Sequence, residues 1–291
     1  MIDIIKQRLR QYGAGNALEE ENAVKEILQE IALYALWRAD FFDVALFQGG
    51  TSLRILHRLP RFSEDLDFLL RAPDPAFDWS PYLKVLREVA AQFGLKLDAQ
   101  PKSRMDTAIR QALLKDDSIA SQLDLSFAGS GRPRTIKIKL EIDVNPPAGS
   151  GEATTYLDFP SDYEVRHQDL ASNFALKIHA LLCRGFLKGR DWFDLSWYVT
   201  QGAVPNLDLL RTALAQAGPW RGREIDVDTA WLKDALSSAI ARIDWPDAAE
   251  DVGRFLRPGE LKSVQLWSER FFLAKVETLV TASSGASRQH A

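Results

Sequence analysis

The chain has little cysteine and histidine and no long hydrophobic run, and each shortage excludes a class of protein. Its single cysteine, Cys183, cannot form an intrachain disulfide, and four histidines add no zinc-ligand pattern. No apolar stretch approaches the roughly 18–20 residues of a membrane span. The charged N-terminus also lacks the apolar core of a signal peptide. The sequence therefore predicts a protein of the cytoplasm with no membrane segment.

An excess of positive charge is also missing, as are internal repeats and low-complexity blocks. The net charge is −4, with 46% hydrophobic and 26% charged residues, which is typical of a globular protein with a sizeable core. A nucleic-acid partner would therefore need a local basic patch. Two basic stretches are candidates, Lys102 to Lys115 and Arg132 to Lys139, although both could be scattered solvated surface.

Hydrophobic periodicity divides the chain into an α/β part and a helical part. The first part has predicted helices at 16–40, 51–59 and 81–93, and predicted strands at 43–48, 66–70, 122–128 and 135–145. From residue 168 onward the pattern is helical, with predicted helices at 169–188, 191–200, 206–217, 228–243, 247–255 and 259–281. Residues 283–291 are small and polar and predict a frayed tail. We expect an α/β domain over residues 1–160 and a mainly helical domain over 161–291.

The most informative segment starts with a double glycine, Gly49-Gly50, between a predicted strand and a predicted helix. Glycines let a phosphate chain approach the backbone closely. The helix then begins with Thr51 and Ser52, whose hydroxyls and N–H groups would form an anion site. Neither a P-loop nor a dinucleotide-binding glycine pattern occurs. The same glycines could simply end a strand.

Two aspartates, Asp65 and Asp67, follow on the next predicted strand, where a spacing of two places them on one face. Paired carboxylates of this kind suit Mg²⁺ bound together with substrate phosphates. The strand at 135–145 alternates apolar and polar residues and carries Asp143 on its polar face. If the two strands are neighbours, Asp143 completes a three-carboxylate cluster that can hold two metal ions. The alternatives are solvated or turn-capping aspartates, and an ordinary charged strand face that includes Glu141.

A basic helix and two acids form a second group. Lys177 and Arg184 are seven residues apart, so they share one side of the helix predicted at 169–188. Asp191 and Asp194 follow directly. Lys177 could equally be a solvated lysine, Asp191 a helix N-cap, and Asp194 an ion-pair partner of Arg190.

The segments Gly49-Gly50-Thr51-Ser52-Leu53-Arg54 and Arg61-Phe62-Ser63-Glu64-Asp65-Leu66-Asp67 resemble the signature of the AbiEii/AbiGii toxin family. This family of nucleotidyltransferase-like proteins belongs to toxin–antitoxin and phage-defence systems and includes the MenT-type toxins. The resemblance is specific in this core and extends more loosely over residues 40–200. A lysine helix followed by an Arg-Asp-x-x-Asp-Leu motif is similar to the family's pattern.

The resemblance implies a nucleotidyltransferase-like mixed sheet with flanking helices, and a helical domain that closes the active cleft. Asp65 and Asp67 would bind Mg²⁺, with Asp143 as a further ligand or general base. Gly49, Gly50, Thr51, Ser63 and Lys177 would bind the nucleoside triphosphate. Asp191 or Asp194 would be a second essential acid.

The expected reaction is transfer of a nucleoside monophosphate from an NTP to an acceptor hydroxyl, with the 3′ end of a tRNA as the acceptor that the resemblance implies. A cognate antitoxin is the expected protein partner. Two alternatives stay open at this point. The acceptor could be a protein or a small molecule, or the chain could be a catalytically silent member that binds a nucleotide or a partner.

Overall fold

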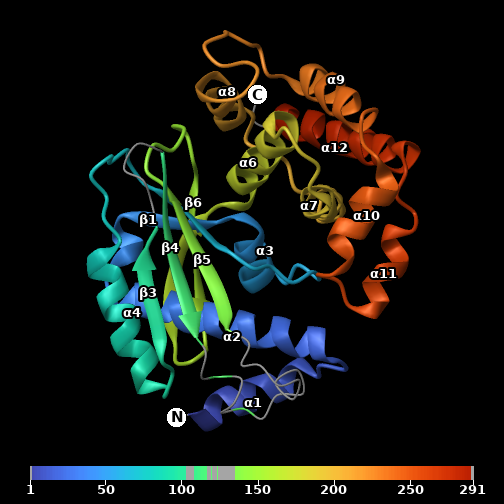
Figure 1. Ribbon diagram of the computed structural model, residues 1–291. Helices are drawn as coiled ribbons and strands as arrows, with labels where there is room; N and C mark the ends of the chain where they lie inside the picture. The colour runs from blue at the N-terminus through green and yellow to red at the C-terminus, as the bar shows by residue number, and fades with distance from the viewer. Residues whose placement is uncertain (1, 103–107, 117–118, 120–122, 124–134, 290–291) are drawn as a thin grey trace. The chain divides into compact units, whose positions relative to one another are not determined.

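The computed structural model describes residues 2–102, 108–116, 119, 123 and 135–289 of the 291-residue chain (Figure 1). Its contacts divide the chain into two compact units. The sheet unit consists of residues 1–58, 62–146 and 152–167, and the helical unit of residues 59–61, 147–151 and 168–291. Two short segments, 59–61 and 147–151, thus belong to the helical unit although sheet-unit residues flank them. A single boundary between residues 160 and 161 does not describe this division.

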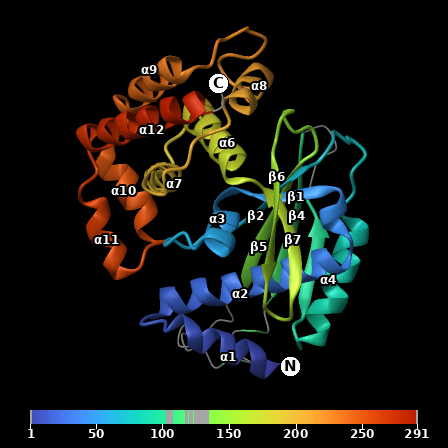
Figure 2. The ribbon, with the colours of Figure 1, turned by 180° about the vertical axis from the view of Figure 1, so that it is seen from behind.

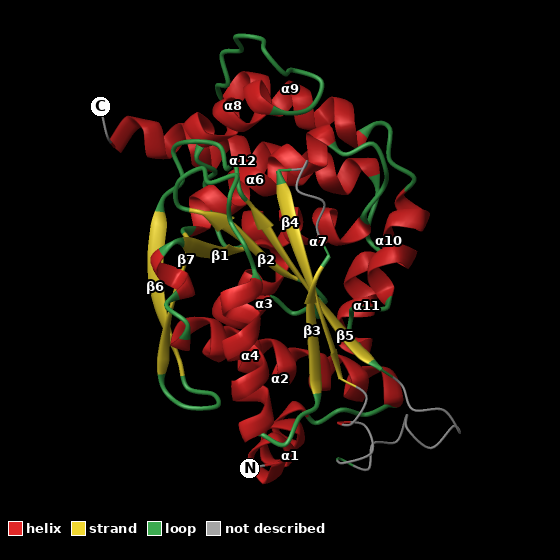
Figure 3. Cartoon of the chain, turned by 60° about the vertical axis from the view of Figure 1, so that its left-hand side comes forward, coloured by secondary structure: helices red, strands yellow, loops and turns green. Residues whose placement is uncertain are grey.

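The sheet unit is built on a mixed sheet of seven described strands in the order β3-β4-β5-β2-β1-β7-β6 (Figure 3). The strands are β1 Ala45–Gln48, β2 Leu66–Leu70, β3 Leu97–Pro101, β4 Ile109–Asp116, β5 Ile136–Asp143, β6 Glu152–Leu157 and β7 Tyr163–Gln168. The accompanying helices are α1 Ile2–Tyr12, α2 Ala17–Arg38, the 3-10 turn η1 Phe41–Asp43, α3 Gly49–His57 and α4 Ser80–Gln92.

One face of this sheet is covered by α2 and α4, which lie in front of the strands in Figure 2. The apolar residues of β5 alternate toward that face and are buried, as are Leu66, Phe68 and Leu70 of β2. The polar residues of β5 occupy the opposite face, together with Asp67. The period of two in the sequence therefore separates the hydrophobic core from the polar surface on which the candidate acids lie.

The helical unit contains α6 Leu170–Cys183, α7 Gly189–Thr200, α8 Leu207–Gln216, α9 Thr229–Ile240, α10 Trp245–Gly253, α11 Pro258–Val264 and α12 Glu269–Gln289. Within it, α6 packs against α8, α7 against α10, and α9 against α12. Phe272 stacks on Trp245 with ring centroids 4.3 Å apart, and Trp192 contacts both rings edge-on. These aromatic contacts join α7, α10 and α12 through their buried faces.

Several predicted elements agree with the structure, and some do not. The strand at 66–70 has the predicted bounds, and the predicted helices at 16–40 and 81–93 correspond to α2 and α4. The single helix predicted at 259–281 is wrong, because α11 and α12 are separate. The hydroxyl of Ser268 accepts a hydrogen bond from the N–H of Phe271 and caps a new helix at that point.

The predicted frayed tail is also wrong, since α12 continues to Gln289. The hydroxyls of Ser283 and Ser284 donate to carbonyls one turn earlier, so these polar residues satisfy themselves inside a helix. Strands β3, β4, β6 and β7 were not predicted, and the strand predicted at 122–128 falls almost entirely outside the described residues. Among the described residues, none of the helices combines the length and apolar character that a membrane crossing requires.

Candidate functional site

Gly49 stands at the turn from β1 to α3 with φ of +77°, a conformation that residues with a side chain rarely adopt. A Cβ at this position would lie 2.6 Å from Oδ2 of Asp67. The strand register explains this closeness, because Gln48 at the end of β1 is paired with Asp67 on β2. Gly49 is therefore required first of all to let the Asp67 carboxylate lie against the backbone of the turn.

The hydroxyls that follow the double glycine hold the backbone together. Thr51 is fully buried, and its hydroxyl donates to the main-chain carbonyl of Asp65. The hydroxyl of Ser52 donates to the carbonyl of Gly49 at 2.8 Å. These contacts tie the start of α3 to the segment that carries the aspartates. Any ligand bound here would meet the N–H groups of the first helical turn, which lack intrahelical acceptors in every helix.

Asp65 and Asp67 share a region with a lysine that sequence reasoning treated only as part of a basic stretch. Nζ of Lys139 on β5 lies 3.7 Å from Oδ2 of Asp65 and 3.2 Å from Oε1 of Glu141. Burial alone would lower the pKa of Lys139, but the nearby carboxylates of Asp65, Glu141 and Asp67 raise it. The polar face of the sheet thus gathers acids around one cation, and the only sequence signal for this was the alternation along β5.

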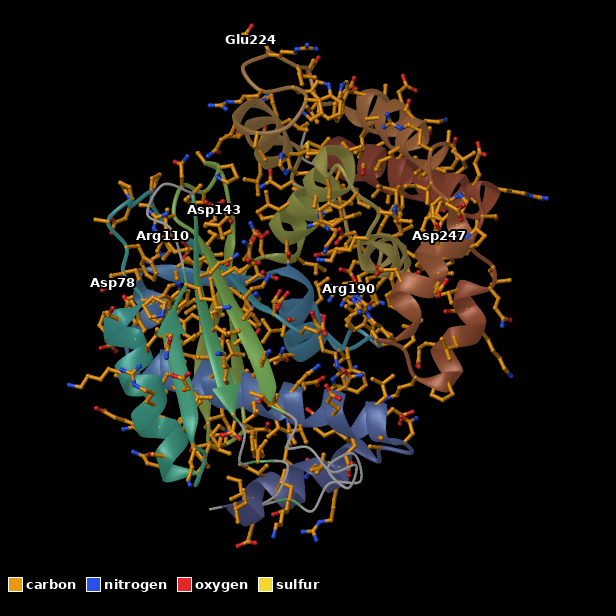
Figure 4. The ribbon with its side chains drawn as sticks, in the orientation of Figure 1. Asp78, Arg110, Asp143, Arg190, Glu224 and Asp247 are labelled. Carbon is orange, nitrogen blue, oxygen red and sulfur yellow. The ribbon has the colours of Figure 1, made fainter. Side chains whose placement is uncertain are left out.

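The prediction that the two acidic strands are neighbours is confirmed. Their register places Glu141, and not Asp143, directly beside Asp67. β2 and β5 are parallel neighbours, and Asp67 is paired with Glu141, whereas Asp143 is paired with Leu69, two residues further along. Asp143 is labelled on β5 in Figure 4. Oδ1 of Asp143 accepts a hydrogen bond from the N–H of Asn145 at 2.9 Å, and burial raises its pKa. In the part of the chain that the structure describes, no three His, Cys, Asp or Glu side chains gather as metal ligands.

Ser63 precedes the aspartates in a loop that α2 holds in place. Its carbonyl accepts a hydrogen bond from Nε2 of the buried Gln29 at 3.0 Å. Lys25, one turn earlier on α2, lies 3.8 Å from Glu64 of the same loop. The side chain of Ser63 is partly exposed. Helix α2 therefore positions the backbone around Asp65 without itself carrying a candidate catalytic residue.

A third contact from α2 reaches the same loop through α3. Oε2 of Glu26 accepts a hydrogen bond from Nε of Arg54 at 2.8 Å. The guanidinium of Arg54 lies over the ring of Phe62, 4.5 Å from its centroid. Arg54 thereby joins the glycine-rich helix to the residues that lead into β2, which explains why an arginine closes the Gly-Gly-Thr-Ser-Leu-Arg segment.

The helical unit holds a second, more tightly paired cluster around Lys177. Its Nζ lies 2.8 Å from Oδ1 of Asp191 and 2.9 Å from Oδ2 of Asp194. Arg61 binds both oxygens of Asp194, each at 2.7 Å, and its side chain and that of Asp194 are 2% and 0% exposed. Arg184 pairs with the other oxygen of Asp191. Lys177 and Arg184 both contact Asp191, but Arg184 lies just past the end of α6, so they do not share one side of a helix as predicted.

The charges in this cluster shift one another strongly. Burial alone would raise the pKa of Asp191, but the cations Lys177, Arg184 and Lys188 lower it to about 2. Burial opposes the charge of Lys177 in the same way, and the carboxylates of Asp191 and Asp194 still raise its pKa. Arg61, Lys177 and Arg184 carry three positive charges against the two negative charges of Asp191 and Asp194. The five side chains therefore keep a net positive charge of one.

The simpler roles considered for these acids do not match the structure. α7 begins at Gly189 with Lys188 at the cap position, so Asp191 is inside the first turn and is not the N-cap. Asp194 is bound by Arg61 and Lys177, and the Arg190 guanidinium stacks on the ring of Phe255. α6 ends at Cys183, five residues before the predicted end of the helix.

The described residues of the two predicted basic stretches divide between surface and core. Lys102 and Lys137 are exposed, and Lys137 on β5 is paired with Lys115 on β4. Arg110 is buried, and its guanidinium donates to the carbonyl of Pro75 at 3.0 Å. Lys139 is engaged with acids, as described above. Arg104, Arg132 and Arg134 lie outside the described residues.

Solved structures identify the class of fold that carries these two clusters. A Helicobacter pylori protein assigned as a nucleotidyltransferase matches with a TM-score of 0.50 and 17% identity, covering 95% of this chain and 98% of that one. The Helicobacter pylori protein JHP933 matches with a TM-score of 0.52 and 16% identity, covering 93% and 95%. At these identities the likeness establishes the fold alone, which is a mixed α/β fold shared with nucleotidyltransferase-like proteins.

The family itself is established by the sequence model that matches residues 31–275, which is most of the chain. That model describes the nucleotidyl transferase AbiEii toxin of type IV toxin–antitoxin systems. The chain belongs to this family. No curated protein matches it.

Proposed function

We propose that this protein is a metal-dependent nucleotidyltransferase toxin that transfers a nucleoside monophosphate from an NTP to a hydroxyl at the 3′ end of a tRNA. The observation that carries the proposal is the contact of Gly49 with Asp67, because it joins the glycine turn to the paired aspartates. A helix start offers N–H groups to phosphate, and adjacent carboxylates offer oxygen to a cation. Family membership supports the reaction type.

Asp65 and Asp67 fit a divalent cation such as Mg²⁺. Both carboxylates are partly exposed, Oδ2 of Asp67 lies in the space that a Cβ of residue 49 would fill, and a lysine ammonium already sits 3.7 Å from Asp65. Asp65 and Asp67 would be the protein ligands, with Asp143 or Glu141 as a further carboxylate. When bound, Mg²⁺ would neutralise the triphosphate and activate the attacking oxygen.

The chemical step follows from these roles. The acceptor oxygen forms a bond to the α-phosphorus of the NTP, the bond from that phosphorus to the α,β-bridging oxygen breaks, and pyrophosphate leaves. The acceptor proton passes to Asp143, the role proposed for this carboxylate. The turn at Gly49, Gly50 and Thr51 would bind phosphate through its N–H groups. Ser63 would add a hydroxyl from the loop that Gln29 positions.

In the helical unit we assign the phosphate contact to Lys177, supported by the net positive charge of its cluster. Asp191 would orient Lys177 and Arg184 through its two oxygens. Asp194 would hold Arg61 and Lys177, so it is a positioning residue in this scheme. The partner expected for a type IV toxin is a cognate antitoxin, and phage defence in the cytoplasm is the proposed setting.

The test uses purified protein with Mg²⁺, each of the four α-labelled NTPs in turn, and total deacylated tRNA. Asp67→Asn is assayed beside Asp98→Asn, a matched control that changes an exposed strand aspartate of the same unit. We expect label on tRNA with the wild type and with Asp98→Asn, and none with Asp67→Asn.

Two other outcomes would change the proposal. Label on a protein band, with none on tRNA, would make the protein a protein nucleotidyltransferase. Absence of label on any acceptor, together with no Mg²⁺-dependent NTP binding, would indicate a catalytically silent binding protein.

A further inference from the structure

The helical unit contains a cavity of about 580 Å³ beside the Lys177 cluster. One wall is the connection between α6 and α7, residues 184–188, and a second wall is formed by Arg242, Ile243, Asp244 and Asp247 around the start of α10. Asp191 and Trp192 of α7 also line it, together with the end of α6, Pro219 and Ala239, and Asp247 is labelled on α10 in Figure 4. Because Asp191 also binds Lys177, the cavity and the cluster share a side chain.

The two walls carry opposite charges. Arg184 and Lys188 lie on the first wall, and Asp244 and Asp247 lie on the second, next to Arg242. Burial lowers the pKa of Lys188, the Asp191 carboxylate raises it, and the neighbouring cations Arg190, Arg184 and Lys177 lower it, so that the net pKa is below the ordinary value. A negatively charged ligand at the first wall would relieve this crowding of positive charge. The carboxylates of the second wall could accept hydrogen bonds from amino or hydroxyl groups.

The first wall also exposes an aromatic ring. Phe186 is 69% exposed, Leu187 beside it is 36% exposed, and the guanidinium of Arg184 lies 5.2 Å from the centroid of the Phe186 ring. An exposed ring next to an arginine is the combination on which unstacked nucleic-acid bases bind. The lining thus combines an exposed ring, three cations and two carboxylates around one cavity.

We propose that this cavity binds the unpaired end of a polynucleotide acceptor, with a base on Phe186 and phosphates at Arg184, Lys188 and Arg242. Asp244 and Asp247 accept hydrogen bonds from base amino groups or ribose hydroxyls on the second wall. This inference rests on the proposed function, since it names the acceptor class of that reaction. It assigns acceptor binding to residues outside the family-like motifs.

The test measures RNA binding separately from transfer. A fluorescein-labelled single-stranded RNA, and the same RNA annealed to its complement without an unpaired end, are titrated with the wild type, Phe186→Ala and Arg242→Ala. Tyr156→Ala is the matched control for loss of an exposed ring, and Arg270→Ala for loss of an exposed arginine. Circular dichroism and melting temperature confirm that each variant is folded.

We expect the single strand to bind the wild type and both controls with similar affinity, and more tightly than the duplex does. Phe186→Ala should weaken single-strand binding at least about fivefold, because base stacking on a ring is lost. Arg242→Ala should reduce the slope of log affinity against log salt concentration by about 0.7, which corresponds to one phosphate contact. Equal binding of single strand and duplex, or wild-type affinity in both cavity variants, would overturn the inference.

Two further outcomes separate this inference from the proposed function. If the wild type labels tRNA and the cavity variants label it at the same rate and affinity, the proposed function stands and the cavity assignment is wrong. If the wild type labels a protein and Phe186→Ala abolishes that label, the cavity takes a peptide and the inference fails. Loss of RNA binding in the cavity variants, in a protein that transfers nothing, would support the cavity and contradict the proposed function.

Discussion

The two acidic clusters of this protein use the same residue type in opposite ways. In the sheet unit, the side chain of Asp65 is 30% exposed, and its cationic neighbour Lys139 is 3.7 Å away. In the helical unit, Asp194 is 0% exposed and is held by Arg61 and Lys177 at 2.7–2.9 Å. The first arrangement leaves carboxylates accessible to a cation, whereas the second neutralises them within the fold. We therefore expect the aspartates of the sheet unit to act in the proposed chemistry and Asp194 of the helical unit to act mainly on stability.

The largest expected effect is on transfer when Asp67 is changed. Asp67→Asn should lower the transfer rate by about a thousandfold, because a metal-ligating carboxylate supports several kcal/mol of transition-state stabilisation. Its free energy of unfolding should stay within about 1 kcal/mol of the wild type. Label transfer and urea unfolding measure the two effects. If Asp67→Asn has a lower free energy of unfolding than Asp194→Asn, the contrast between the two acidic clusters is wrong.

Asp194→Asn should act mainly on stability. Removing one partner of a buried ion pair leaves Arg61 inadequately compensated, so the free energy of unfolding should fall by about 3–5 kcal/mol. The double variant Arg61→Met with Asp194→Leu should recover much of this loss. Asp208→Asn, which breaks the exposed pair with Arg211, is the control and should cause no measurable change. Full stability in Asp194→Asn with no transfer would make Asp194 catalytic instead.

Gly49→Ala should combine a backbone effect with a site effect. The positive φ costs about 1–2 kcal/mol for a residue with a Cβ, and the new methyl group would displace the Asp67 carboxylate. A displacement near 1 Å costs about a hundredfold in rate. Gly13→Ala is the control, because Gly13 has φ of +57° with no atom within 4 Å of an added Cβ. Equal loss of transfer in both variants would show that the effect of Gly49→Ala does not come from its contact with Asp67.

Acid should weaken the helical unit through Asp191. Its pKa is about 2 in the folded protein against an ordinary value of 3.8, so its contribution is complete above about pH 4 and disappears as the pH falls through 2. The difference in unfolding free energy between the wild type and Asp191→Asn should shrink by about 2 kcal/mol over that window. Thermal unfolding at several pH values measures it, and a constant difference would disprove the paired state of Asp191.

The smallest expected effect concerns Gln29, which supports the loop of Ser63. Among the described residues, Oε1 of Gln29 is buried without a hydrogen-bond partner, while Nε2 donates to the Ser63 carbonyl. Gln29→Leu removes both the bond and the unsatisfied oxygen, so stability should change by less than about 1 kcal/mol. Transfer should fall several-fold because the loop loses a support. An unchanged transfer rate would show that the contacts of Lys25 and Arg54 are enough to hold the Ser63 loop in place.

Local pattern allowed the sequence to predict much of the site. The strand at Leu66–Leu70, the alternation along β5 and the turn at Gly49 follow from residues that are neighbours in the chain. The convergence of Lys177 and Arg184 on Asp191 does not follow from the period of one helix, because α6 ends at Cys183 and Arg184 lies beyond it in extended backbone. Strands β3 and β6 were not predicted because neither has a strong apolar alternation. In β3 only Ala99 is buried, and in β6 no residue is buried.

By itself, the sequence determined which residue types stand at the glycine turn, on the acidic strand and on the lysine helix, since each is a local choice of amino acid. Only the tertiary structure decided their partners. It paired Asp67 with Glu141 instead of Asp143, placed Lys139 beside Asp65, and joined Arg61 to Asp194 across 133 residues. Periodicity describes one segment, whereas register and ion pairing depend on how distant segments pack, and a single residue of register changes which carboxylates face each other.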